Sequence, residues 1–436
     1  MTPEQLTMLA REAVVYYLPL YEMARMQAAG SPRRNSAGRN ADPSQTPPLD
    51  TSWRWINLFS HRRQLLGAAD RRVVTSNADT LYSNAWLNLQ RGPLLVQVPD
   101  TGERYQSFTF LDFWTNPFAY AGTRAQGNHA RTYFIHGQRW NGKVPEGTVP
   151  IVSPTNDIWL IGRIQADRGE NLSAVHSIQD SLRVVMADRP GYPFDGTAID
   201  TGIDLKQPLG DPSLFLQIVN QALRMNPAPA SEAALMARFA ALGFGPEAAA
   251  LPDFGLLGEA VAFVADVLAK PFSVPLKGGW SLPFDIHEGY GRNYALRARV
   301  ARNHIGAVGH EEAFYVMAEV DGFGQELDGQ HRYLLHFPAD ALPEAFAFWS
   351  VTMYRKSDRT LVENTVERHC IGSRTPGLRF DANGGLTITM GAKQPPSGVN
   401  WLPAPPEPFY IALRLYQPGP VHLERRFSYP PIQRLD

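Results

Sequence analysis

The sequence predicts a mainly β protein of two sandwich-like domains with a helical segment between them. Short apolar runs alternate with Gly-, Pro- and Asn-rich turns over 51–205 and again over 283–436, a pattern typical of sandwiches or barrels. Between them, 206–282 has apolar residues at helical spacing and an alanine-rich end. A helix and a loop occupy 1–50, so these four ranges are the predicted domains.

The first helix is predicted from its capping residues. Thr2 can cap the helix, Pro3 suits its first turn, and Gln5 completes a capping box. Gly30, followed by Ser and Pro, ends the apolar helical periodicity. The polar stretch 33–48 then predicts a loop.

Clear strand signals follow in both blocks. In the first they are Leu94–Val98, Tyr105–Phe110 and Ile158–Ile161, and Asn171–Met186 is predicted to be a helix. The second block contains one helix-like stretch at Tyr294–Arg302.

An aromatic triplet occurs once in each block. Phe113-Trp114-Thr115 in the first matches Phe348-Trp349-Ser350 in the second. The repeat indicates a duplicated sandwich, although chance similarity explains so short a match equally well.

Composition excludes several classes of protein. Hydrophobic residues make up 44% and charged residues 19% of 436 positions, which argues against disorder. The net charge is −1 and no Lys/Arg run occurs, so no nucleic-acid partner is expected. The single cysteine, Cys370, rules out an internal disulfide and is expected to be an inert thiol.

Segments for targeting and membrane insertion are not apparent. No run of ~18 apolar residues exists, so no membrane span is expected. The first residues lack a basic region followed by an apolar run, which favours a cytoplasmic location.

Nucleotide and metal motifs are also missing. Without a Gly-x-Gly-x-x-Gly or phosphate-loop phrase, no nucleotide cofactor is expected. The histidines show no zinc spacing, but a divalent metal ion held by residues from several strands stays open.

The segment 77–86 is the first candidate site. Asn77, Asp79 and Tyr82 belong to a dense run of polar groups, and Asp79 could act as a base or a metal ligand. Alternatively, Asn77 and Asp79 simply hydrogen-bond a local turn.

A second candidate lies at 105–114. Tyr105 and Asp112 could form a proton donor and its orienter, with Trp114 against the substrate. The structural alternative is that Asp112 anchors a turn and Trp114 fills the core.

Polar and aromatic residues of the second block could complete a pocket. Ser350 and Tyr354 share one face of a predicted strand, and Arg414 could hold a carboxylate through two hydrogen bonds. Asn400 and Trp401 are further candidates for substrate binding. An Arg–Asp structural pair is an equally good interpretation of Arg414.

Several longer phrases resemble a bacterial two-part family, composed of domains of unknown function 1254 and 1214. The phrases of the first part are Asn77–Trp86, Val98–Asp100, Arg104-Tyr105, Leu111–Thr115 and Gly122–Arg124. Those of the second part are Asp321–Gly324, Leu327–Gly329, Ala347–Tyr354, Asn400–Pro405 and Arg414–Tyr416. The resemblance implies two jelly-roll-like antiparallel β-sandwiches flanking a small helical segment, and it strengthens the case for duplication. Many relatives carry an export signal, but no agreed reaction accompanies the family.

Two functional hypotheses follow. The first is an enzyme, hydrolase or lyase, acting on a small organic molecule in a pocket in or between the sandwiches. It would use acid/base or metal-assisted chemistry with Asp79, Tyr105 and Asp112. The alternative is a non-catalytic small-molecule or carbohydrate-binding module. Assembly into a homo-oligomer through the helical segment is compatible with either.

Overall fold

The computed structural model describes residues 1–38, 52–71, 74–192, 194–205, 210–245, 252–286, 289–396 and 398–436. Most of the loop predicted at 33–48 lies outside these residues. No helix in the described part of the chain is long and apolar enough to cross a membrane.

The first sandwich is built from two facing sheets. The larger has the order β2-β3-β9-β5-β6 and the smaller β10-β4-β7-β8. Apolar side chains of β3, β5 and β9 meet those of β4 and β7 in a buried core. The strands are β2 (Phe59–His61), β3 (Thr80–Asn88), β4 (Leu94–Val98), β5 (Gln106–Asp112), β6 (Pro117–Gly122), β7 (Arg131–Gly137), β8 (Thr148–Ser153), β9 (Asp157–Gln165) and β10 (Arg183–Met186). Near them are α2 (Thr123–Gln126), α3 (Ser173–Ser181) and the pair β1 (Trp53–Ile56) and β11 (Thr197–Asp200).

The second sandwich repeats this design. Its larger sheet has the order β12-β13-β14-β20-β16-β17 and its smaller sheet β19-β18-β15-β21, with a separate apolar core between them. The strands are β12 (Val274–Pro275), β13 (Trp280–Leu282), β14 (Ala313–Ala318), β15 (Tyr333–Phe337), β16 (Ala345–Arg355), β17 (Cys370–Gly372), β18 (Leu386–Gly391), β19 (Asn400–Pro403), β20 (Phe409–Pro418) and β21 (Gln433–Arg434). The short helix α8 (Pro420–Leu423) follows β20.

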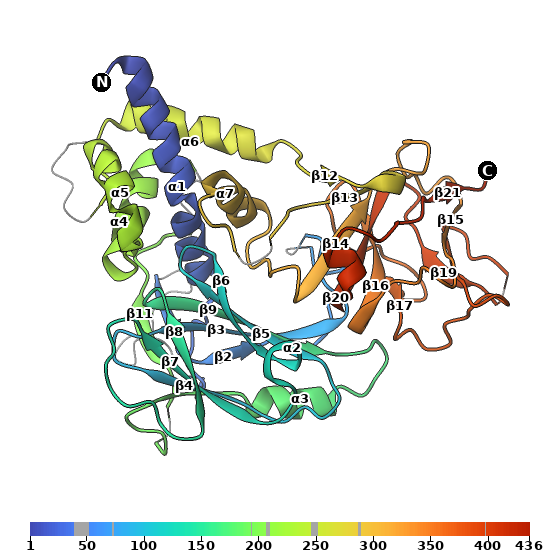
Figure 1. The fold of residues 1–436 in the computed structure, drawn as a ribbon, viewed down its shortest axis with the longest axis horizontal. Helices are drawn as coiled ribbons and strands as arrows, with labels where there is room; N and C mark the ends of the chain where they lie inside the picture. Colours follow the sequence, from blue (N-terminus) through green and yellow to red (C-terminus); the bar gives the residue numbers. More distant parts are fainter. Residues whose placement is uncertain are drawn as a thin grey trace.

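The helices form one layer against the outer face of the first large sheet. A single apolar cluster joins the first helix to the central helices and to Trp86, Trp114 and Ile161 of the first half. Figure 1 shows these helices on one side of the molecule and the second sandwich on the other. The helices are α1 (Pro3–Gly30), α4 (Pro212–Met225), α5 (Ala233–Phe239), α6 (Phe254–Ala269) and α7 (Tyr294–Asn303), with 3₁₀ turns at Ala230–Glu232, Ala240–Leu242 and Lys277–Gly279.

The predicted fold class is confirmed. The capping box is present, with the Thr2 hydroxyl accepting from the Gln5 backbone and the Gln5 side chain accepting from Thr2. The domain boundaries stay a prediction, but α1 and α7 pack together with the central helices rather than with separate units. Two details differ from expectation. The segment predicted as one helix at 171–186 ends as strand β10, and the pairs β7–β8 and β18–β19 are parallel.

The duplication is visible in the strand order. The sheets β3-β9-β5-β6 and β10-β4-β7-β8 correspond, strand for strand, to β14-β20-β16-β17 and β21-β15-β18-β19. The parallel pair falls at the same place in both halves. The aromatic triplets do not mark equivalent positions, because Phe113 follows β5 whereas Phe348 lies within β16.

Candidate functional site

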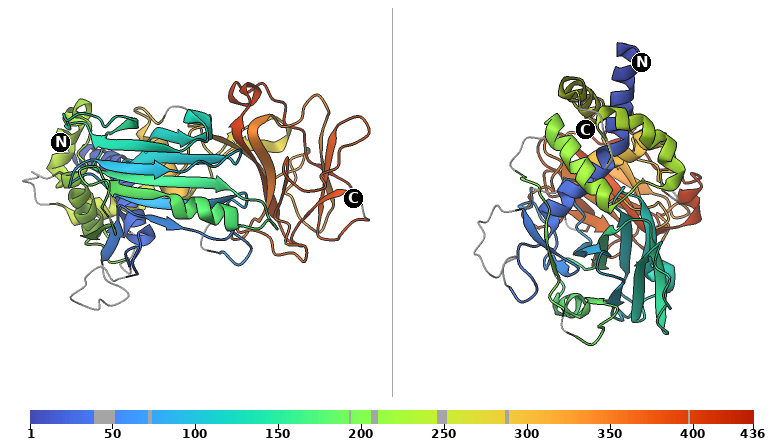
Figure 2. Two further views of the ribbon diagram at one scale, coloured as in Figure 1. Left: turned by 90° about the horizontal axis from the view of Figure 1, so that it is seen from below. Right: turned by 90° about the vertical axis from the view of Figure 1, so that its left-hand side faces the viewer.

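A large cleft lies between the two halves of the molecule. It has a volume of about 1690 Å³ and is lined by β3 and β9 of the first sandwich, β14 and β20 of the second, and the ends of α6 and α7. Figure 2 shows the strands of the first sandwich running toward the second. Apolar clusters that combine residues of both halves adjoin the cleft and hold the large sheets together.

Equivalent residues of the two halves meet in this cleft. Arg163 on β9 is in register with Tyr82 on β3 and Ser107 on β5. In the second half, Arg414 on β20 is in register with Tyr315 on β14 and Ser350 on β16. The guanidinium carbon is 5.5 Å from the ring centre of Tyr82 in the first half and 5.5 Å from that of Tyr315 in the second. Duplication therefore places two Arg–Tyr pairs on facing sheets.

Both terminal nitrogens of Arg414 donate hydrogen bonds within the protein. Its Nη2 donates to the backbone oxygen of Thr75 at 2.7 Å, and its Nη1 donates to the hydroxyl of Tyr354. That hydroxyl donates in turn to the oxygen of Ser76 at 2.6 Å. Arg414 thus fixes the segment that precedes β3 onto the second sandwich.

Arg163 has a different environment. Its Nη2 donates to the oxygen of Gly306 in a long contact of 3.3 Å, and its buried Nη1 has no hydrogen-bond partner among the described residues. Only 8% of the Arg163 surface is exposed. In the described part of the chain, the hydroxyls of Tyr82 and Tyr315 also make no hydrogen bond, and both residues line the cleft. The three groups together offer unused donors to whatever occupies the cleft.

Each half extends an acidic residue into the other. Asp79 directly precedes β3 and accepts from the Ser350 hydroxyl at 2.7 Å and from the Cys370 thiol at 3.5 Å. Glu312 directly precedes β14 and accepts from the Tyr105 hydroxyl and from Arg124 Nε, each at 2.7 Å. Because these contacts cross the boundary between the halves, they tie the two sheets together beneath the cleft.

Two of the three predicted catalytic residues belong to these contacts. Asp79 and Tyr105 are absent from the cleft lining. Burial raises the pKa of Asp79, and burial together with Glu312 raises the pKa of Tyr105 well above its usual value. Near neutral pH the Tyr105 phenol therefore stays protonated and serves as a hydrogen-bond donor to Glu312.

The third predicted catalytic residue lies elsewhere. Asp112 is at the far end of β5 from Tyr105, about 20 Å away at the rise of ~3.3 Å per strand residue. It accepts from the backbone of Trp114 and from the backbone and side chain of Asn116, so it closes a turn. Trp114 is buried in the helical layer, with its ring centre 5.2 Å from that of Tyr16. The structure does not bring Asp112 and Tyr105 together.

The predicted substrate-binding residues are divided between the cleft and the interior. Asn77, Tyr82 and Arg414 line the cleft. Ser350 and Tyr354 are buried beneath it, where they hold the segment before β3.

Asn400 and Trp401 lie on β19, in the second sandwich's smaller sheet. The Asn400 amide donates to the oxygens of Arg379 and Thr387, and the Trp401 indole donates to the oxygen of Gly391. Neither residue lines the cleft, so the structure does not bring them together with Arg414.

Sequence reasoning missed Arg163 and Tyr315. A charged residue inside the apolar run of β9, between Gly162 and Ile164, was the available signal, because an arginine is seldom fully buried without a purpose. Tyr315 carried no such signal, since its importance depends on the pairing of β14 with β20.

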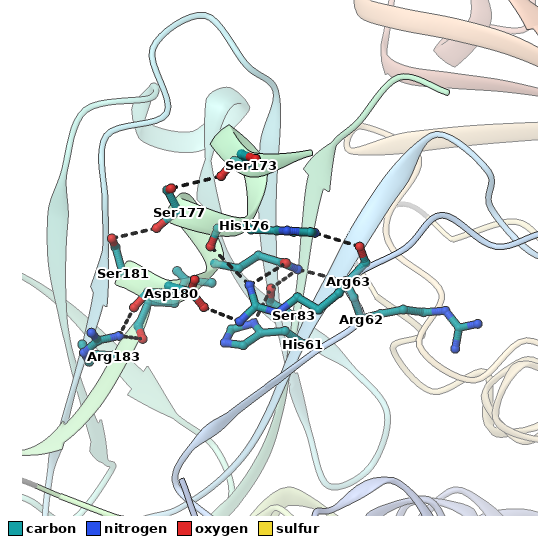
Figure 3. Close-up of polar contacts among 12 residues, drawn as sticks. His61, Arg62, Arg63, Ser83, Ser173, His176, Ser177, Asp180, Ser181 and Arg183 are labelled. Carbon is teal, nitrogen blue, oxygen red and sulfur yellow. Dashed lines mark hydrogen bonds and ion pairs between the residues drawn. The ribbon is translucent and has the colours of Figure 1, made fainter. Parts of the chain in front are cut away.

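A serine–histidine contact near the cleft is buried and structural rather than catalytic. The Ser83 hydroxyl lies 2.9 Å from His61 Nδ1 and accepts from Gln179 of α3 at 3.2 Å, and Ser83 is fully buried. Figure 3 shows this contact beside the Arg63–Asp180 pair that also holds α3. Burial lowers the pKa of His61 to about 4, so its ring is neutral near pH 7. The cluster therefore holds α3 against the first large sheet.

No metal centre is apparent. Among the described residues, no three His, Cys, Asp or Glu side chains lie close enough together to hold a metal ion. The metal-assisted form of the enzyme hypothesis therefore lacks a ligand set in this part of the chain.

The fold and site define a duplicated two-sandwich protein with an arginine-lined cleft between its halves. Residues 56–186 match the family model for domain of unknown function 1254, and residues 312–420 match the model for domain of unknown function 1214. The chain belongs to the two-part family that combines these domains, as its sequence phrases predicted.

One solved structure supports the same fold. A Vibrio parahaemolyticus protein is 23% identical with a TM-score of 0.72, over 99% of this chain and 100% of that one. A Burkholderia cenocepacia protein is 14% identical with a TM-score of 0.47, over 98% and 88% of the two chains. The first likeness concerns the fold alone, and the second is too distant to add to it. A comparison with curated proteins gave no match.

Proposed function

We propose that the cleft between the halves binds a small organic acid, whose acidic group is held by Arg163 with Tyr82 and Tyr315. The observation that carries the proposal is the buried Nη1 of Arg163, which has no hydrogen-bond partner among the described residues. A buried guanidinium with an unused donor is costly, and an anion at that position offsets the cost.

The geometry suits a carboxylate. A guanidinium presents parallel N–H groups that match two carboxylate oxygens, and charge-assisted hydrogen bonds of this kind are stronger than neutral ones. The hydroxyls of Tyr82 and Tyr315 can donate to the same group. Since one tyrosine comes from each half, the bound acid would contact both sandwiches.

The charge of the cleft agrees with an acidic ligand. Its described lining contains eight Lys or Arg side chains and two carboxylates, Asp70 and Glu319, although the whole chain has a net charge of −1. Four of the cations are paired with carboxylates: Arg62 with Asp70, Arg63 with Asp180, Lys270 with Asp266 and Arg302 with Glu22. The other four, Arg163, Arg299, Arg359 and Arg414, form no ion pair within the described residues. Such a concentration of one sign attracts anions.

Binding is better supported than catalysis. The residues predicted to perform acid/base chemistry, Asp79, Tyr105 and Asp112, all lie outside the cleft lining. The geometry therefore favours the alternative of a non-catalytic small-molecule-binding module, and catalysis in the cleft stays a prediction.

The test compares acids with uncharged analogues of the same shape. Hexanoate and benzoate are titrated into the full chain by calorimetry, with hexanamide and benzamide as matched neutral ligands. We expect the acids to bind and the amides to bind at least tenfold more weakly. Arg163→Gln should weaken acid binding on the order of 10- to 100-fold, the equivalent of a lost charge-assisted hydrogen bond.

Two controls keep the result interpretable. Arg139→Gln removes an exposed arginine outside the cleft and should leave affinity unchanged. Circular dichroism and urea unfolding verify that Arg163→Gln is folded. Equal affinity for acids and amides, or full acid binding by the folded Arg163→Gln variant, would refute the proposal.

A further inference from the structure

A second group of cations lies in the same cleft. Arg299 lies on α7, and Arg359 lies in the turn that follows β16. Both line the cleft together with His304, and their positive charges lower the pKa of this histidine. Burial first, then the positive charges of Arg359 and Arg299, lower the pKa of His304 to about 4. The imidazole is therefore neutral near pH 7, and it shares the cleft lining with two permanent positive charges.

These two arginines also lack acidic partners. Arg299 Nη1 donates to the oxygen of Lys270 at 3.1 Å, and its guanidinium carbon is 4.8 Å from the ring centre of Phe272. The guanidinium of Arg359 lies 5.1 Å from the ring centre of Tyr410. Within the described chain neither forms an ion pair, so their charge is available to a ligand.

The cleft has room for a ligand that reaches both places. Its volume of about 1690 Å³ exceeds the roughly 300–1,000 Å³ of ordinary small-molecule sites. Apolar side chains of Ile161, Phe284 and Met317 also line it, which suits a hydrocarbon linker.

We infer that the ligand carries two acidic groups, one held by Arg163, Tyr82 and Tyr315 and the other between Arg299 and Arg359 beside His304. This rests on the proposed function and adds to it the chemical class of the ligand, a dicarboxylate or a related diacid. The first acidic group meets residues of both sandwiches. The second meets a helix of the helical layer and a turn of the second sandwich, so the diacid would connect all three parts of the molecule.

The test is a length series. Linear dicarboxylates from malonate to sebacate are titrated into the full chain beside monocarboxylates of equal carbon number. A second arginine contact predicts an optimum length at which the diacid binds on the order of 10- to 100-fold more tightly than its monoacid. Arg299→Gln and Arg359→Gln should each reduce that advantage, and Arg139→Gln should not.

His304 supplies a spectroscopic measurement that is independent of affinity. A carboxylate beside the ring opposes the effect of Arg299 and Arg359, so the pKa of His304 should rise when the optimal diacid binds and stay near 4 with the monoacid. Proton–nitrogen NMR follows the ring, with the His304→Asn variant to assign its signals.

The outcomes separate the two proposals. Diacids that bind no more tightly than monoacids, or a His304 pKa unchanged by the best diacid, would overturn the second acidic position and leave the proposed function intact. Failure of every acid to bind would overturn both.

Discussion

Arg163 and Arg414 occupy equivalent positions in the two halves, but they have different tasks. Arg414 donates to Thr75 and Tyr354, so the segment before β3 is fixed on the second sandwich. Arg163 makes one long contact with Gly306 and keeps Nη1 unpartnered within the described chain. The two sandwiches place an arginine at the same strand position. Arg414 joins the halves, whereas Arg163 lines the cleft with a buried nitrogen that has no partner among the described residues.

The acidic residues that cross between the halves have also diverged. Glu312 accepts from a phenol and an arginine, whereas Asp79 accepts from a hydroxyl and a thiol. The charge of Glu312 is compensated by Arg124, which is within ion-pair distance. Residues at equivalent strand positions in the two halves therefore do not contribute equally to the free energy of folding.

The largest expected effect is on stability at Arg414. Arg414→Gln leaves the Thr75 oxygen and the Tyr354 hydroxyl without their donor, and we expect it to lower the free energy of unfolding by about 4 kcal/mol. Arg163→Gln breaks the long Gly306 contact and the contact with the Tyr82 ring, and it should cost about 1 kcal/mol. Urea unfolding measures both, and equal losses would contradict the division of tasks.

The next effect concerns the pH dependence of stability and Asp112 at the end of β5. The equivalent position at the end of β16 is Arg355, which has no carboxyl to titrate in this way. Burial raises the pKa of Asp112 from 3.8 to about 6, so between these values the folded state holds a proton that the unfolded state has released. The contribution of Asp112 to the free energy of unfolding should therefore fall by about 3 kcal/mol as pH rises from about 4 to about 6, then level off. Asp112→Asn should remove this contribution to the slope and leave that of other buried carboxyls such as Asp79, whose pKa is also raised, as measured by urea unfolding across that range. Asp188→Asn, at an exposed carboxylate, should retain it.

A smaller difference is expected between the two crossing acids. Glu312→Gln removes the charge that faces Arg124 and should cost about 2 kcal/mol, because Arg124 then lies against a neutral amide. Asp79→Asn keeps an acceptor for Ser350 and relieves a buried carboxylate, so its cost should stay below about 1 kcal/mol. Thermal unfolding of the two variants compares them directly, and a larger loss at Asp79 would reverse the comparison.

The smallest effect is expected at the paired tyrosines. Tyr82→Phe and Tyr315→Phe remove one hydroxyl each from the cleft, and each should weaken acid binding by about 1 kcal/mol with little change in stability. Tyr192→Phe, an exposed tyrosine, is the matched control. Loss of affinity in only one variant would show that the acid lies against a single half.

Part of the cleft lining could be predicted from sequence. Asn77, Tyr82 and Arg414 were selected as binding residues, and all three line the cleft. The polar groups at 77–86 are dense, but most of them hold the turn and the neighbouring sandwich, and a functional role for the segment stays a prediction. Asp112 shows the same limit, because a carboxylate that closes a turn and one that takes part in chemistry look identical in sequence.

The sequence by itself determined the local elements: the capped first helix, the apolar strands, the helical segment, and the phrases that mark both halves of the family. Those depend on periodicity and on side-chain chemistry within a few residues. Only the tertiary structure decided the cleft. Arg163 and Arg414 are 251 positions apart in the chain, and they face one space because two duplicated sheets pack across it. Whether the guanidinium nitrogens of an arginine find hydrogen-bond acceptors depends on which groups of the other half lie next to them. A local sequence pattern contains no information about that contact.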